Sequence, residues 1–212
     1  MAYRVLVIVP TYNERDNIDQ AVAGIRQYAP DVDILVADDN SPDGTGQMAD
    51  ELAVGEPRLH VLHRPGKAGL GAAYRAGFAW GLARGYEALV EMDADGSHQP
   101  EELPKLLAAL PNADVVLGSR WVRGGSVVNW PLSRKLLSRG GSLYARTVLG
   151  VPIRDVTGGF RAFRSTAVQR MGLLSSDAQG YVFQVDSSFR ASRLGLRVVE
   201  VPIQFVERTA GV

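Results

Sequence analysis

The chain has 212 residues, and apolar residues make up 46% and charged residues 22% of it. These fractions exclude intrinsic disorder and a fibrous repeat. There is no cysteine, which excludes a disulfide framework, a zinc-thiolate site and a thiol nucleophile. Because domains usually run to about 100–200 residues, we expect a single domain over 1–212, with an amino-terminal half (1–120) and a carboxy-terminal half (121–212).

The formal net charge is zero, but the charges are unevenly distributed. Between Val115 and Arg154 there is no Asp or Glu, while seven residues are Arg or Lys. The other 172 residues carry sixteen basic and twenty-three acidic side chains. This basic segment, 115–154, is therefore suited to bind anions.

Five short runs rich in Val, Leu and Ile predict strands that are buried on both faces. They are Arg4–Val9, Asp33–Ala37, Leu59–His63, Ala88–Met92 and Asp114–Ser119. The first run is too short for a signal peptide or a membrane span, so we expect neither. Helical patterns cover 18–28, 71–84 and 100–110. This alternation predicts an α/β fold with a mostly parallel sheet and helices on both faces.

The pattern changes after Arg120. The next eleven residues, 121–131, predict a loop, and Leu132–Leu149 predicts an amphipathic helix interrupted at Gly140-Gly141. A strand over 160–163, a helix over 183–194 and one last strand over 197–205 follow. No repeat or low-complexity linker separates this part from the first 120 residues.

Three polar clusters directly follow predicted strands. They are PTYNE (10–14), DDNSPDGT (38–45) and DADGSH (93–98). Since ligands bind at the carboxyl ends of parallel strands, we expect the three clusters to meet at one edge of the sheet. Convergence of this kind is typical of a nucleotide site.

Asp93 and Asp95 can direct two carboxylates to one point if the strand geometry persists through Ala94, because residues i and i+2 share one side of an extended chain. Oxygen ligands of this kind suit Mg²⁺ or Mn²⁺, which takes one or two carboxylates and completes its shell with phosphate and water. The alternative is a solvated turn after a strand. The position directly behind a buried strand favours the metal.

The second cluster has two interpretations. From Asp39 onward it matches much of an EF-hand calcium loop, with Gly44 at the sixth position and Asp50 at the twelfth. An EF-hand needs a preceding helix, however, and here a strand enters. We therefore favour a βα loop, in which Asp38 and Asp39 accept hydrogen bonds from a ribose or a base and Thr45 is the helix N-cap.

Other motifs carry less chemistry. PGKAGLG (65–71) lacks the spacing of a phosphate loop and predicts a turn into a closely packed helix. The histidines are not spaced as a zinc site, and there is no G-x-S-x-G elbow for acyl transfer.

The collinear motifs VIVPTYNERDNI, VADDNSPDGT, MDADGSHQPEELPKL, LGSRWVRGG, SRKLLSRGGSLYAR and DVTGGFRAF resemble family 2 glycosyltransferases of the GT-A fold. The resemblance is greatest to the polyprenol-phosphate (dolichol-phosphate) mannose synthases and extends over essentially the whole chain. It implies a Rossmann-like sheet and transfer of mannose from GDP-mannose to a polyprenyl phosphate with inversion at the sugar carbon.

The resemblance also implies roles for individual residues. It implies that Pro10, Tyr12 and Glu14 line the guanine nucleotide pocket. Ala37 and Asp39 would hold the base and ribose region. Asp93, Ala94 and Asp95 match the segment that carries the metal and the diphosphate. Arg120 and Arg134 match arginines near the diphosphate and the acceptor phosphate, and Arg208 matches a donor-phosphate arginine.

The sequence departs from the family pattern at two places. Some relatives have a glutamine as third metal ligand where Ser97 stands, so that Ser97, His98 or water is left to complete the shell. The family usually continues with a Ser-Lys pair after the position of Gly211-Val212, where this chain ends.

Such a reaction suits the residues, because a phosphate monoester is already ionised at neutral pH and needs no general base. Arginines and a divalent cation, with Asp95, Arg120 and Arg134 as the central groups, would stabilise the anions. We expect the basic segment, with its leucines and Trp121 and Trp130, to rest on the cytoplasmic side of the cell membrane. A solvated helix with one face in the core is the alternative.

The expected partners are GDP-mannose, a polyprenyl phosphate and a membrane surface, reached peripherally or through a membrane-spanning partner or fused domain. No nucleic acid is expected. The alternatives are a glycosyltransferase using another nucleotide sugar, one with a soluble acceptor and a carboxylate base, and a non-catalytic nucleotide- or calcium-binding module.

Overall fold

The computed structural model describes residues 3–178 and 180–207. Its strands are β1 (Val5–Thr11), β2 (Asp33–Asp38), β3 (Leu59–His63), β4 (Ala88–Glu91), β5 (Val115–Ser119), β6 (Ser126–Val128), β7 (Arg161–Arg164), β8 (Val198–Pro202) and β9 (Gln204–Val206). Its helices are α1 (Arg15–Tyr28), α2 (Thr45–Ala53), α3 (Leu70–Ala83), α4 (Leu103–Ala109), α5 (Leu132–Leu149), α6 (Ser165–Met171) and α7 (Tyr181–Arg193). Short 3₁₀ turns η1 (Pro100–Glu102), η2 (Leu110–Asn112) and η3 (Leu173–Ser175) complete the elements.

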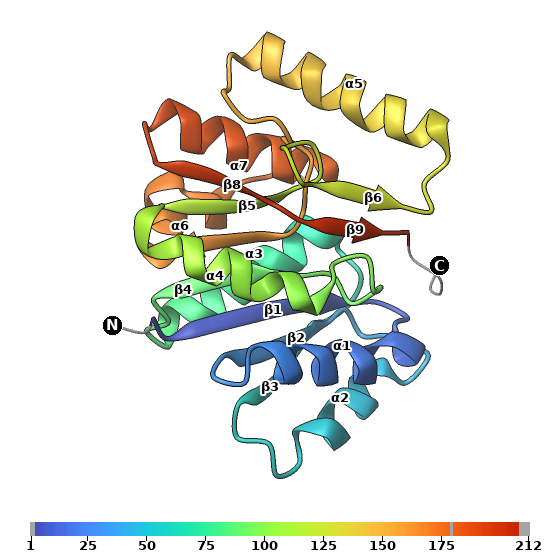
Figure 1. The fold of residues 1–212 in the computed structure, drawn as a ribbon. Helices are drawn as coiled ribbons and strands as arrows, with labels where there is room; N and C mark the ends of the chain where they lie inside the picture. Colours follow the sequence, from blue (N-terminus) through green and yellow to red (C-terminus); the bar gives the residue numbers. More distant parts are fainter. Residues whose placement is uncertain (1–2, 179, 208–212) are drawn as a thin grey trace.

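The main sheet has the strand order β3-β2-β1-β4-β7-β5-β8. Every neighbouring pair is parallel except the two pairs that β7 makes. The predicted α/β fold with a mostly parallel sheet is therefore confirmed. Strands β7 and β8 come from the carboxy-terminal part of the chain, yet they complete the same sheet as β1 to β5 (Figure 1).

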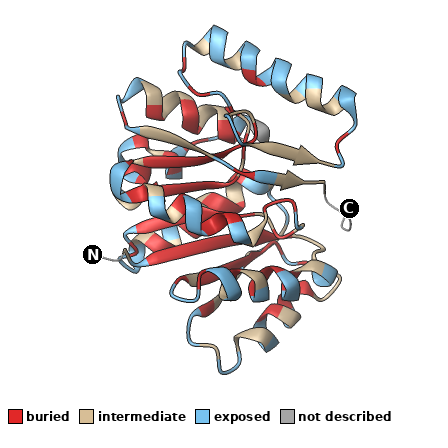
Figure 2. Ribbon diagram, viewed as in Figure 1, coloured by how far each residue is buried: buried red, intermediate tan, exposed pale blue. Residues whose placement is uncertain are grey.

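Helices cover both faces of the sheet, and a hydrophobic core lies under each group. One core packs α1, α2 and α4 against Val7, Val9 and Val36. The other packs α3, α6 and α7 against Leu6, Ile8 and their neighbours. Neighbouring residues of one strand supply opposite cores because side chains alternate along a strand. Figure 2 shows the inner strands of the sheet buried, whereas β8 at one edge is of intermediate exposure.

The register of the parallel strands brings the predicted polar clusters to one edge. Thr11 at the end of β1 pairs with Asp38 at the end of β2, and Ile8 pairs with Glu91 at the end of β4. The three loops that follow therefore leave the sheet side by side, as the sequence predicted.

The prediction of one continuous last strand over 197–205 is wrong. The segment breaks at Ile203 into β8, which extends the main sheet, and β9, which pairs with β6 in a separate two-stranded sheet. Strand β6 lies inside the segment predicted as a loop, 121–131. Ile203 is buried and its backbone N–H bonds to Ser119, so the chain turns away from the main sheet there.

Helix α5 has the predicted bounds but is not interrupted at its glycine pair, because Gly140 and Gly141 lie within one continuous helix. Its only buried residue is Ser142. Six large apolar side chains are 61–78% exposed: Leu132, Leu136, Leu137, Leu143, Tyr144 and Val148. The alternative of a helix with one face in the core is therefore wrong for most of α5, which lies at the margin of the molecule (Figures 1 and 2). Within 3–178 and 180–207, no helix combines the length and hydropathy needed to cross a bilayer.

Helix α3 lies close to the sheet, as its glycine-rich sequence predicted. A Cβ at Gly77 would stand 2.5 Å from the Cγ2 of buried Ile8. We expect Gly77→Ala to lower the free energy of unfolding by about 1–3 kcal/mol because the core becomes overpacked.

The matched control is Gly140→Ala in α5, where a Cβ would meet no atom within 4 Å. Alanine is the better helix former there, so this change should be neutral or stabilise by up to about 1 kcal/mol. Urea unfolding of both variants tests the pair, and equal effects would contradict the close packing of α3.

Candidate active site

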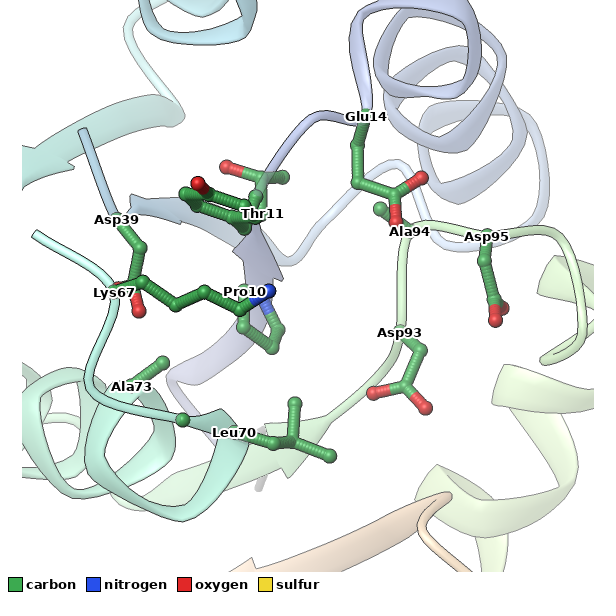
Figure 3. Close-up of a pocket in the computed structure, with 12 residues that line it drawn as sticks. Pro10, Thr11, Glu14, Asp39, Lys67, Leu70, Ala73, Asp93, Ala94 and Asp95 are labelled. Atoms are coloured by element: carbon green, nitrogen blue, oxygen red, sulfur yellow. The ribbon is translucent and has the colours of Figure 1, made fainter. Parts of the chain in front are cut away.

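A pocket of about 290 Å³ opens at the carboxyl ends of β1, β2 and β4 (Figure 3). It brings together seven of the predicted site residues: Pro10, Tyr12, Glu14, Asp39, Asp93, Ala94 and Asp95. Ala37 is not in the lining, because it is fully buried within β2. Four carboxylates around a pocket of this size make it suited to a cation with a polar ligand rather than to a bare anion.

The two aspartates at the end of β2, Asp38 and Asp39, have different functions in the structure. Asp38 is buried and accepts hydrogen bonds from the Thr11 hydroxyl (2.9 Å) and the Ser41 backbone N–H (3.0 Å), so it fixes the loops to each other. Asp39 lines the pocket, where its carboxylate is held by an ion pair with Arg64 and by the Ala68 backbone N–H at 3.1 Å. Only Asp39 is therefore placed to meet a ligand.

The loop before α2 is a βα loop and not a calcium loop, because strand β2 enters it. Asp50 does not turn back to the loop but lies 3.0 Å from His63 Nε2. The predicted cap at Thr45 is wrong: Gly44 is the N-cap, with φ +89°, a conformation that glycine adopts without strain. The Thr45 hydroxyl instead accepts the Glu14 backbone N–H at 3.0 Å and so joins the first loop to the second.

The DAD segment lies beyond the strand, since β4 ends at Glu91. The condition of persistent strand geometry is therefore not met, but in Figure 3 the carboxylates of Asp93 and Asp95 still point to the same side of the loop. Asp95 Oδ1 accepts the Ser97 backbone N–H at 3.0 Å, and Asp93 Oδ1 accepts the Tyr74 hydroxyl at 2.6 Å. Burial, with the Asp93 charge as the next cause, raises the pKa of Tyr74 well above its usual value, so the phenol is the donor.

His98 is a structural residue rather than a metal ligand in this geometry. Its Nδ1 accepts the Asp93 backbone N–H at 2.9 Å, so the neutral ring carries its proton on Nε2 and has no lone pair left for a metal. The ring is 2% exposed and stacks on Phe160 at 5.0 Å. In the TGGF turn next to this ring, a Cβ at Gly158 would lie 3.2 Å from the Gly118 carbonyl oxygen, which favours a glycine there.

The donor set fits a hard divalent cation with two protein carboxylates. Within 3–178 and 180–207 there is no group of three His, Cys, Asp or Glu residues that could hold a metal. Ser97 is buried and does not line this pocket. It is also absent from the lining of a second pocket, of about 430 Å³, that Asp93 and Asp95 border. A cation at Asp93 and Asp95 would thus take most of its shell from phosphate and water, which is how Mg²⁺ is usually bound.

Lys67 is a pocket residue that the sequence did not assign to the site. The PGKAGLG segment is the predicted turn into α3, but its lysine also reaches into the pocket, with Nζ 4.1 Å from the centre of the Tyr12 ring (Figure 3). The available signal was two basic residues directly behind β3, Arg64 and Lys67, at the same sheet edge as the three polar loops.

Two of the three arginines implied for phosphate binding are held by carboxylates. Buried Arg120 donates from Nε and Nη2 to Asp155 at 2.8 and 2.7 Å, and Asp155 also accepts the Arg120 backbone N–H. Arg134 on α5 forms an ion pair with Glu207 and lies 4.3 Å from the Trp130 ring centre. Arg208 lies outside the described residues.

Strand β9 connects the acidic loop to the basic segment. Its Phe205 forms an isolated antiparallel β-bridge with His98, and its Val206 N–H donates to the Ser97 carbonyl at 3.3 Å. On its other side it pairs with β6. Glu207, directly after β9, lines a second pocket of about 430 Å³ together with Asp93 and Asp95. The residue that holds Arg134 therefore also borders the predicted metal site.

A buried polar network lies beneath the site. Arg161 on β7 donates to the carbonyls of Val156, Gly158 and Gln184, and so ties the TGGF turn to α7. Gln184 donates in turn to Glu91 at 2.9 Å. Burial raises the pKa of Glu91 to about 8, although the nearby Arg161 charge opposes the shift. Sequence reasoning gave Gln184 no function, because only the fold places it against Glu91.

A family model described as "Glycosyl transferase family 2" matches residues 6–172. The chain belongs to glycosyltransferase family 2. A relative of 56% identity is an undecaprenyl-phosphate mannosyltransferase from Micrococcus luteus, matched over 98% of this chain and 86% of that protein. A second, also 56% identical, is a polyprenol monophosphomannose synthase from Mycolicibacterium smegmatis, with 99% and 80% covered.

Solved structures share the fold of this family 2 chain. The glucosyl-3-phosphoglycerate synthase of Mycobacterium tuberculosis, in complex with Mn²⁺, UDP and glucosyl-3-phosphoglycerate, has a TM-score of 0.71 at 20% identity and covers 99% of this chain and 72% of its own. A mannosyltransferase from Pyrobaculum calidifontis, in complex with GDP-mannose and Mn²⁺, has a TM-score of 0.64 at 22% identity, with 99% and 58% covered. The predicted GT-A fold is confirmed.

The Arg120–Asp155 pair should contribute strongly to stability. Asp155→Asn removes the negative charge and leaves the buried guanidinium without its counter-ion, so we expect a loss of about 3–5 kcal/mol in the free energy of unfolding. Urea unfolding measures it.

The matched control is Asp31→Asn, which breaks an ion pair between Arg58 and an aspartate whose side chain is 98% exposed. Water and salt screen such a pair, so no measurable change is expected. A tolerated Asp155→Asn would contradict the assignment of Asp155 as the partner that fixes Arg120.

Proposed function

We propose that this protein is an inverting glycosyltransferase that moves mannose from GDP-mannose to a polyprenyl phosphate and releases GDP. Both relatives of 56% identity carry names for mannose transfer to such a lipid, and they match nearly the whole chain. The solved mannosyltransferase that shares the fold holds GDP-mannose and Mn²⁺. In this proposal residues 1–120 form the nucleotide-binding half and residues 121–212 the acceptor-binding half, and Arg120 lies at the boundary between them.

The observation that carries the proposal is the position of Glu207 between two sets of charges. It lines the pocket that includes Asp93 and Asp95, and it holds Arg134 of the basic segment. A cation site for a diphosphate and an arginine for a second phosphate thereby border the same residue. Transfer between two anionic substrates needs this arrangement, because their charges must be neutralised close together.

On the donor side, we assign the nucleotide to the pocket formed by Pro10, Tyr12, Glu14 and Asp39. Asp93 and Asp95 would hold Mg²⁺ or Mn²⁺, since two carboxylates and an open remainder of the shell fit either ion. The chemistry that such a cation supplies is neutralisation of the departing diphosphate. Arg208, implied for a donor phosphate, remains a prediction.

On the acceptor side, Arg120 and Arg134 are the proposed phosphate-binding arginines. Asp155 fixes the Arg120 guanidinium in one orientation, whereas Arg134 must exchange Glu207 for the lipid phosphate. The phosphate monoester is largely ionised at neutral pH because its second pKa is about 6. One of its oxygens attacks the sugar carbon as the bond to GDP breaks, and no proton has to be removed.

The decisive experiment is transfer of label from radioactive GDP-mannose into extracted lipid. We expect label in the organic phase only when polyprenyl phosphate and Mg²⁺ or Mn²⁺ are present, and none with unphosphorylated polyprenol or with EDTA. Asp95→Asn should lower the rate more than the roughly 10–100-fold that loss of an outer-shell partner costs. Arms with UDP-glucose and a water-soluble acceptor test the alternative transferases, and nucleotide binding without turnover in any arm would contradict the proposal.

We further propose that α5 rests on the cytoplasmic surface of the cell membrane. Its exposed leucines, Tyr144 and Val148 have no core to cover them, and Lys135, Arg139 and Arg146 lie on the same helix. Apolar side chains beside basic ones favour the interface of an anionic bilayer. Arg134, on the same helix, would then stand near the level of the lipid phosphates.

Charge reversal tests this placement. Lys135→Glu with Arg139→Glu should lower binding to anionic vesicles by about 10-fold or more, since each basic residue near such a surface contributes about 1 kcal/mol. Arg170→Glu with Arg193→Glu changes the net charge equally on α6 and α7 and should leave binding nearly unchanged. Co-sedimentation measures both, and equal losses would contradict a membrane contact at α5.

A further inference from the structure

Asp93 is fixed at two points by neighbouring side chains. Its backbone N–H donates to His98 Nδ1 at 2.9 Å, and its Oδ1 accepts the Tyr74 hydroxyl at 2.6 Å. Tyr74 lines neither of the two pockets that Asp93 borders, whereas His98 is in the lining of the second, of about 430 Å³. Tyr74 therefore acts on the aspartate from behind.

The Tyr74 ring is held rigidly. It is fully buried in α3 and lies 6.4 Å, in a stacked orientation, from Phe78. Phe78 in turn contacts Phe163 of β7 at 5.6 Å. The hydroxyl is thus carried by a helix that packs closely against β1 and by an aromatic cluster in the core.

The two oxygens of Asp93 are consequently not equivalent. Oδ1 accepts the hydrogen bond of the Tyr74 hydroxyl, whereas among the described residues no hydrogen bond to Oδ2 is found. His98 Nδ1 lies 3.8 Å from Oδ2, beyond hydrogen-bond distance, and that nitrogen already accepts the hydrogen bond of the Asp93 backbone N–H. Oδ2 is the oxygen left to meet a cation.

We propose that Tyr74 is a positioning residue for the metal site: by taking Oδ1 it orients the Asp93 carboxylate so that Oδ2 alone faces the cation and the diphosphate. This inference rests on the proposed function. An untethered carboxylate can rotate and offer either oxygen or both, so a fixed one loses less conformational freedom when the cation binds. Groups that orient metal ligands in this way typically contribute about 10–100-fold to metal affinity.

The chain contains a matched control for this bond. The Tyr86 hydroxyl donates to Asp33 Oδ2, also at 2.6 Å, but this pair lies at the amino ends of β2 and β4, away from the pocket. Tyr74→Phe and Tyr86→Phe therefore remove the same kind of bond and keep the ring, one at the site and one at the opposite edge of the sheet.

The test is Mn²⁺ binding in the presence of GDP, followed by the electron paramagnetic resonance signal of free Mn²⁺. Tyr74→Phe should weaken Mn²⁺ binding by about 10-fold, and its transfer rate should recover at saturating Mn²⁺, while Tyr86→Phe should bind as the wild type does. Thermal unfolding of both variants without metal reports any general loss of stability.

A Tyr74→Phe affinity within twofold of the wild type would overturn the inference, and so would an equal loss in Tyr86→Phe. Both outcomes leave the proposed function standing if the wild type binds Mn²⁺ and transfers mannose. A wild-type protein that transfers no mannose and binds no Mn²⁺ with GDP would overturn the proposed function and this inference with it.

Discussion

The parallel pairing of β1 with β2 and β4 is the constraint on which the site depends. Parallel strands end at the same edge of a sheet, and here Thr11 lies beside Asp38 while Ile8 lies beside Glu91. The loops that follow carry Tyr12, Asp39 and Asp93. Because these loops leave the sheet at the same edge, the three residues line one common pocket. A shift in this register by one residue would turn the strand side chains to the wrong core and separate the loops.

Charge is the second organising principle of the molecule. Four carboxylates surround the pocket, whereas the basic segment has none of its own and takes its counter-ions from elsewhere. Asp155 neutralises Arg120 inside the protein, and Glu207 neutralises Arg134 near its surface. The two pairs differ in burial, since the Arg120 side chain is 8% exposed and that of Arg134 is 40% exposed. The first is a fixed element of the fold, whereas the second costs little to break, as the proposed exchange of Glu207 for a phosphate requires.

Strand β9 lies between the acidic pocket and the basic segment. It is only three residues long, yet it touches the loop that carries Asp95 on one side and β6 on the other. A ligand that moves Glu207 therefore also acts on β9, which is hydrogen-bonded to the loop that carries Asp93 and Asp95. Tyr74 acts on the same loop from the opposite side, through the core, so the DAD segment is held from both directions.

The sequence by itself determined the α/β fold, the edge at which the polar clusters meet and the bounds of α5, because alternating apolar runs and helical spacing are local properties. It did not determine the break at Ile203, the partners of Arg120 and Arg134 or the position of Lys67. Those depend on contacts between residues far apart in the chain, such as Asp155 with Arg120. The orientation of Asp93 was likewise decided only by tertiary structure, since β4 ends at Glu91 and Tyr74 of α3, nineteen residues earlier, fixes the Asp93 carboxylate.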